Sequence, residues 1–122
     1  MCSSDLLDPQ LHAFRKLDAE GARNAARAAE AAVMAGDTLG PLHGVPVAVK
    51  ELIAVRDMPF WDGSAGKQVI ADRDAIEVER RRKAGAIIFG TTIGGLTVFE
   101  FGDGEGQPQN PFDRSQIGRA HV

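Results

Sequence analysis

The chain has 122 residues, enough for one small domain, and its apolar and charged fractions of 43% and 25% are those of an ordinary globular protein. A net charge of -3 argues against direct nucleic-acid binding and against attraction to an anionic membrane surface. The single cysteine excludes a disulfide framework and a cysteine-based metal site, and no apolar run is long enough to span a membrane. The composition therefore predicts a cytoplasmic protein without metal or cofactor.

The first predicted element is one long helix over residues 9–35. Asp8 is placed to cap it, and Pro9 suits the first helical position, where a missing N–H costs nothing. Three apolar residues recur at helical spacing: Leu11, Phe14 and Leu17. The residues that follow are mostly alanine, glutamate and arginine, which are strong helix formers, and Gly36 is expected to end the helix.

A buried strand is predicted over residues 45–49. It is short, rich in β-branched residues and preceded by a turn of glycine and proline over residues 40–44. Lys50 stands at its end. Such a lysine either lays its aliphatic stem on apolar surface with its ammonium in water, or is desolvated enough to become a neutral catalytic base. The strand alone favours the first interpretation, because functional lysines are a minority of strand-end lysines.

A second helix is predicted over residues 74–83 and a second strand over residues 86–89. Asp72 or Asp74 can cap this helix, and Gly85 ends it. The residues expected on its apolar face are Ile76 and Val78. Strand, helix and strand in this order form a βαβ unit, which implies a parallel pair of strands with a right-handed crossover.

The remaining segments are predicted to be loops or short turns. Residues 60–67 form a loop that contains the only tryptophan, Trp61, which is expected to fill the edge of the core. Residues 91–92 could cap a following turn, and residues 96–101 are apolar enough to be buried. Residues 102–113 are polar and rich in glycine and proline, and long loops of this kind tend to carry function.

The two ends of the chain can be encoded by opposite strands of one oligonucleotide. Residues 117–122 can be written ATC GGA AGA GCA CAC GTC, and the reverse complement, read from its GTG as a start codon, encodes residues 1–5. The string resembles a sequencing-library adapter. We therefore expect residues 1–6 and 116–122 to be artefact and residues 7–115 to be the N-terminal fragment of a single domain. The longer protein that would contain this fragment is called the parent protein below.

Several ordered motifs resemble those of the amidase signature family. Residues 40–51, Gly-Pro-Leu-His-Gly-Val-Pro-Val-Ala-Val-Lys-Glu, are similar to the family pattern G-P-L-H-G-V-P-x-x-V-K-D, with Glu51 in place of the usual aspartate. The other stretches that match family motifs are residues 63–65, 72–75, 82–92, 99–102 and 110–113. The likeness therefore covers most of the chain.

This resemblance implies an α/β fold, the N-terminal part of a mixed twisted sheet covered by helices. It also implies amide hydrolysis by a serine nucleophile, a second serine in a cis peptide and a lysine, and Lys50 matches the position of that lysine. In this chemistry the neutral lysine removes the nucleophile's proton through the second serine and returns it to the leaving amine. Burial keeps such a lysine neutral, and we expect the apolar strand end to supply that burial.

Other members of the triad are not found. In the family, the Gly/Ser-rich stretch with both serines and the oxyanion hole follows the motif that residues 110–113 resemble. Ser64 matches a structural loop position and Ser115 has no glycine-rich loop around it, so neither is assigned as the nucleophile. Thr91 stands where the family usually has lysine. The chain alone is therefore predicted to be inactive, with Lys50 as its one triad residue.

Three functions are open for the parent protein. The first is a serine-dependent amidase that converts a small-molecule carboxamide into an acid and ammonia or an amine. The second is the amidase subunit of a glutamyl/aspartyl-tRNA amidotransferase complex, which would require partner subunits. The third is a non-catalytic α/β binding module in which Lys50 only packs. The identity of the amide and the formation of a homo-oligomer stay open.

Overall fold

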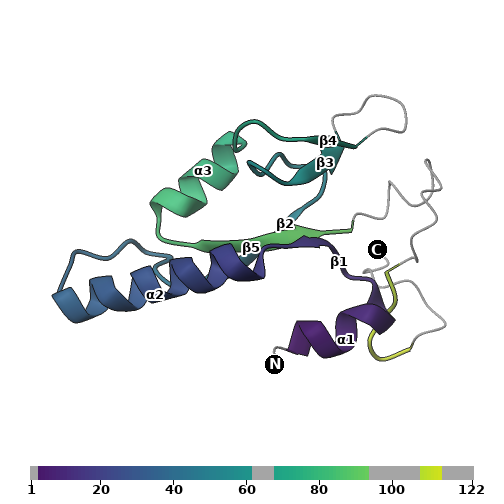
Figure 1. The fold of residues 1–122 in the computed structure, drawn as a ribbon, viewed down its shortest axis with the longest axis horizontal. Helices are drawn as coiled ribbons and strands as arrows, with labels where there is room; N and C mark the ends of the chain where they lie inside the picture. Colours follow the sequence, from purple (N-terminus) through teal and green to yellow (C-terminus); the bar gives the residue numbers. More distant parts are fainter. Residues whose placement is uncertain (1–2, 62–67, 94–107, 114–122) are drawn as a thin grey trace.

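The computed structural model describes residues 3–61, 68–93 and 108–113 (Figure 1). The helices are α1 (Ser3–Leu11), α2 (Ala19–Ala35) and α3 (Ile76–Lys83). The strands are β1 (Phe14–Leu17), β2 (Pro46–Lys50), β3 (Pro59–Trp61), β4 (Gln68–Ile70) and β5 (Ile87–Thr92). Within these ranges no helix is both long and apolar enough to cross a bilayer.

The main sheet has the strand order β1-β5-β2, with β5 in the centre. Strand β1 is antiparallel to β5 and β2 is parallel to it, so the sheet is mixed. Strands β3 and β4 form a separate antiparallel pair. Figure 1 shows α3 and α2 on either side of β5. This arrangement confirms the predicted α/β architecture of a mixed sheet covered by helices.

The predicted βαβ unit is present as β2, α3 and β5. Its strands are parallel, with Pro46 opposite Ile87 and Lys50 opposite Thr92. The second strand is longer than predicted, because it continues through Gly90 to Thr92. The prediction that residues 91–92 cap a turn was wrong: both residues pair with β2 on one side, and β1 pairs on the other, so the central strand extends as far as its neighbours do.

The single helix predicted over residues 9–35 was wrong. Two helices flank strand β1, and the break between them is fixed by aspartates. The Asp8 carboxylate accepts from the backbone N–H groups of Ala13 (2.8 Å) and Phe14 (3.0 Å), beyond the end of α1. Asp18 caps α2 by accepting from the N–H of Gly21. The Phe14 ring contacts Phe89 of β5 at a centroid distance of 5.6 Å, so it packs from a strand and not from a helix.

Helix α2 ends as predicted at Gly36, which has φ of 75° in the left-handed region and bonds back to the carbonyls of Ala32 and Val33. None of the described side chains of α2 is buried. Val33 and Met34 are 54% and 83% exposed. We expect the isolated chain to show no cooperative thermal unfolding by circular dichroism, because so much apolar surface remains in water. A sharp, reversible transition would contradict this.

The core of the described residues lies between the main sheet, α3 and the loop after β2. Its members are Val49, Val55, Met58, Val78 and Ile88. The expected apolar face of α3 was correct for Val78, which is fully buried, and wrong for Ile76, which is 68% exposed. Trp61 is 7% exposed at the end of β3, so it is buried as predicted, although on a strand and not in a loop.

The turn before β2 packs against the turn before β5 through backbone atoms. The N–H of Leu42 donates to the carbonyl of Ala84 (2.9 Å), and the N–H of Gly44 donates to the carbonyl of Gly85 (3.0 Å). A Cβ added to Gly40 would meet the Ala84 carbonyl oxygen. The imidazole Nε2 of His43 lies 2.9 Å from the carbonyl oxygen of Ala29 and so ties the first turn to α2. The two motif segments that contain these glycines thus contact each other directly.

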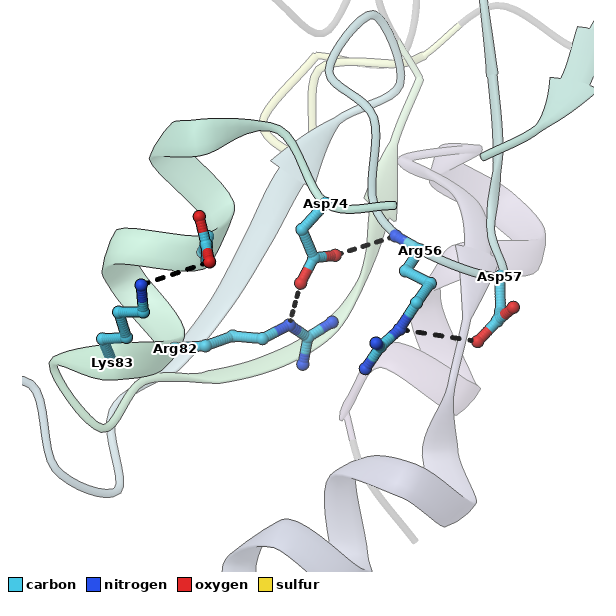
Figure 2. A network of polar contacts seen from close by, with 6 residues as sticks. Arg56, Asp57, Asp74, Arg82 and Lys83 are labelled. Carbon is cyan, nitrogen blue, oxygen red and sulfur yellow. Dashed lines mark hydrogen bonds and ion pairs between the residues drawn. The ribbon is translucent and has the colours of Figure 1, made fainter. Parts of the chain in front are cut away.

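The prediction that Asp72 or Asp74 caps α3 was wrong. The N-cap is Ala75, without a side-chain hydrogen bond, and the Asp74 carboxylate accepts from the backbone N–H of Arg56 and from Nε of Arg82, both at 2.8 Å (Figure 2). The Asp74 side chain is 11% exposed. It therefore joins the loop after β2 to the last turn of α3.

We expect Asp74→Ala to lower the free energy of unfolding of the parent protein by about 2 kcal/mol, because it leaves a backbone N–H and a guanidinium without their partner. The matched control is Glu79→Ala. Glu79 pairs with Lys83 at 3.1 Å on the exposed face of α3, and such pairs contribute about 0–1 kcal/mol. Urea denaturation measures both. Equal losses in the two variants would show that Asp74 is only another surface carboxylate.

Candidate functional site

Lys50 is the last residue of β2 and lies opposite Thr92, the last residue of β5. Because β2 and β5 are parallel, their carboxyl ends meet at one edge of the sheet. In α/β sheets, ligands bind outside the carboxyl ends of the strands. The candidate active site is therefore this edge, with Lys50 as its candidate base.

The end of β2 does not bury Lys50. Val49 is 2% exposed and belongs to the core, whereas Lys50 is exposed. Successive side chains of a strand point to opposite faces, so Lys50 lies on the face away from Val49. The expectation that the apolar strand end supplies the burial is thus wrong for the described residues.

The backbone on both sides of Lys50 is held firmly. The carbonyl of Lys50 accepts from the N–H of Ile53 (2.9 Å), which forms a tight turn directly after the strand. The N–H of Glu51 donates to the carbonyl of Thr92 (3.0 Å), and the carbonyl of Glu51 accepts from the N–H of Trp61 (3.1 Å). Strands β5 and β3 therefore both contribute to fixing the point from which the Lys50 side chain starts.

A buried ion pair lies next to Lys50. Nε of Arg15, on β1, donates to Oε2 of Glu51 at 2.7 Å, and the two side chains are 6% and 0% exposed. No sequence pattern indicated that these residues meet, since Arg15 was assigned to a helix. The only local signal was a glutamate directly after an apolar strand, where a buried carboxylate requires a cationic partner.

Thr91 contributes a second buried polar group to the same edge. It is fully buried, lies opposite Val49 in the β2 ladder, and its Oγ1 has no hydrogen-bond partner among the residues that the structure describes. This is the position where the family motif usually has lysine.

The other motif residues are only partly placed. Residues 63–65, including Ser64, residues 99–102 and Ser115 lie outside the described residues. Asn110 accepts from the N–H of Phe112 (2.9 Å) in a turn, and Phe112 is 98% exposed. In the described ranges, no three His, Cys, Asp or Glu residues are grouped closely enough to hold a metal ion.

Comparison with known proteins now identifies the family. A family model described as Amidase matches residues 2–117. The chain belongs to the amidase signature family. Among the relatives of this amidase-signature chain is a subunit of the glutamyl-tRNA(Gln) amidotransferase of Acidothermus cellulolyticus, 41% identical over 117 residues, a match that covers 91% of the chain and 23% of the relative.

Solved structures agree with this membership. The peptide amidase of Stenotrophomonas maltophilia matches with a TM-score of 0.64 and 34% identity, over 73% of the amidase-signature chain and 19% of its own. Another match is a structure from a vestigial protein complex, described as revealing the evolutionary origins of an s-triazine catabolic enzyme. It has a TM-score of 0.79 and 27% identity, and the match covers 94% of the amidase-signature chain and 26% of the other chain. The chain thus spans about a quarter of the length of the curated relatives it matches (23%).

Proposed function

We propose that the parent protein hydrolyses the C–N bond of a carboxamide, with Lys50 as the base of a Ser-cisSer-Lys triad. The observation that carries this proposal is the placement of Lys50 at the carboxyl edge of β2, within the family motif and on a backbone fixed from both sides. The two serines would come from residues outside the described ranges.

In the proposed chemistry one proton moves from the nucleophilic serine to Lys50 and then from Lys50 to the leaving nitrogen. The nucleophilic serine attacks the carbonyl carbon while its hydroxyl proton passes through the second serine to neutral Lys50. Lys50 then returns the proton by the same route to the leaving nitrogen as the C–N bond breaks, which releases ammonia or an amine. Water hydrolyses the acyl-serine and releases the acid.

A lysine in open water carries its proton at neutral pH and cannot serve as a base. Lys50 is exposed among the described residues, so the proposal requires other parts of the parent protein to cover it. The relatives support this requirement, because the chain matches only 23% of the length of the amidotransferase relative. Covering Lys50 would then be the task of the rest of the same domain in the parent protein.

The direct test is to incubate the purified parent protein with a panel of primary carboxamides, aryl amides and peptide amides. We expect stoichiometric release of carboxylate and of ammonia or amine, measured by an ammonia-coupled assay and by mass spectrometry. Absence of hydrolysis of every amide, by a protein shown to be folded, would contradict the first proposal.

A second candidate is the amidase subunit of a tRNA-dependent amidotransferase. The observation that favours it is the 41% identity to a subunit of glutamyl-tRNA(Gln) amidotransferase. In this case ammonia release from glutamine should require the partner subunits and the aminoacyl-tRNA. We therefore expect co-purification with such subunits from the native organism, and little turnover of simple amides by the isolated protein. Turnover of simple amides by the protein alone favours the first candidate.

A further inference from the structure

We propose that the buried Arg15–Glu51 ion pair is a positioning device that sets the place of the Lys50 side chain for catalysis. The inference rests on the proposed function, because it assumes that Lys50 is the base. Neither Arg15 nor Glu51 is assigned a contact with substrate. Both act through the backbone from which Lys50 projects.

The pair connects two strands that do not pair with each other. Strand β5 lies between β1 and β2 in the sheet, so β1 and β2 share no ladder hydrogen bonds. The bond from Nε of Arg15 to Oε2 of Glu51, 2.7 Å long, spans from β1 to the residue directly after β2. The bond therefore links β1 to the end of β2 at the edge of the sheet where the ladder between β2 and β5 ends.

Glu51 is held by contacts in three directions. Its N–H bonds to β5 through Thr92, its carbonyl bonds to β3 through Trp61, and its carboxylate bonds to β1 through Arg15. Of the three bonds just named, the bond to Arg15 is made by the side chain and the other two are made by the backbone. A change of this side chain alone can therefore release the end of β2 from β1 while the backbone bonds remain.

Stability alone does not explain an ion pair at this place. Removing two charges from water is costly, and apolar residues of similar volume often replace a buried pair without loss of stability. Compared with apolar packing, the pair adds a fixed orientation of the two side chains, because a guanidinium and a carboxylate bond only at a narrow set of angles. Direction matters next to Lys50, since a displacement of about 1 Å at a reacting group can cost about 100-fold in rate.

The test measures kcat, KM and thermal midpoint for three variants of the full-length parent protein. Glu51→Gln keeps size and polarity but removes the charge, and the double variant Arg15→Met/Glu51→Leu replaces the pair by apolar side chains. Glu79→Gln is the control, since it removes a carboxylate from an exposed ion pair on α3. Lys50→Ala is measured in parallel as the reference for loss of the base.

We expect Glu51→Gln to lower kcat about 10- to 100-fold with KM changed less than about 3-fold. The double variant should recover the thermal midpoint of the unsubstituted protein and still show a kcat at least about 10-fold reduced. The control should match the unsubstituted protein. If the pair were only structural, the double variant would recover kcat together with the thermal midpoint. A recovered thermal midpoint with a reduced kcat therefore indicates a positioning role.

A double variant that regains both stability and kcat would overturn the inference and leave the pair a structural contact. The same holds if Glu51→Gln is folded and fully active while Lys50→Ala is inactive. If Lys50→Ala itself is fully active, the proposed function fails, and that result is distinct from the other two. If Glu51→Gln does not fold, the kcat and thermal midpoint of the double variant decide between a positioning role and a structural role for the pair.

Discussion

Replacement of Lys50 by alanine in the parent protein is expected to lower kcat for amide hydrolysis by about 1,000-fold or more. A positioned base contributes about 100- to 10,000-fold, and without it the serine hydroxyl remains a weak nucleophile. The thermal midpoint should stay within about 2 °C of the unsubstituted protein, because Lys50→Ala removes no side chain of the described core cluster and removes an amine whose covering in the parent protein is itself costly. Lys50 is exposed among the described residues and has no place in the core cluster.

Two further variants separate base chemistry from charge. Lys50→Arg keeps a cation of similar reach, but a guanidinium does not lose its proton in proteins, so this variant should be as inactive as Lys50→Ala. Lys83→Ala removes a lysine that pairs with Glu79 on α3, and it should be fully active. Steady-state turnover of the best amide substrate is the measurement. Activity of Lys50→Arg near that of the unsubstituted protein would show that Lys50 acts only as a charge.

The segments that the sequence predicted well are those whose pattern is local. Strand β2, helix α3 and strand β5 are short periodic or apolar runs bounded by glycine, and the structure places all three close to the expected positions. Strand β1 failed because it has only four residues, with Arg15 and Lys16 between Phe14 and Leu17. The spacing of those two apolar residues favours a helix, because residues three apart point to opposite faces of a regular strand, and the pairing of β1 has a register shift between Phe14 and Lys16. Pairing with β5 decides between them, and that contact is not visible in the sequence.

The same distinction applies to the candidate site. Lys50 could be found from its motif, since all the residues that define the motif are neighbours in the chain. The Arg15–Glu51 pair joins residues 36 positions apart, and its recognition requires the register of β1 on β5. The prediction that the strand end itself buries Lys50 was wrong among the described residues for a related reason: burial depends on what covers a residue, and Val47 and Val49 point to the opposite face of β2.

A large effect on stability is expected from Gly85→Ala, at the contact between the two turns that precede β2 and β5. Gly85 has φ of 95°, a conformation in which a side chain costs about 1–2 kcal/mol. In addition, an added Cβ would lie 2.8 Å from Cα and 3.1 Å from the backbone nitrogen of His43. Backbone atoms cannot move aside as the end of a flexible side chain can. The turn before β2 would therefore have to shift away from β5.

We expect Gly85→Ala to lower the free energy of unfolding of the parent protein by about 3–5 kcal/mol, in the range of severe single substitutions. Gly36→Ala is the matched control, because Gly36 also has positive φ, 75°, but an added Cβ there meets no atom within 4 Å. Its loss should be about 1 kcal/mol. The difference between the variants, measured by urea denaturation, isolates the contact with His43 from the conformational cost. Equal losses would mean that the two turns separate freely, and that their packing does not hold β2, and with it Lys50, against β5.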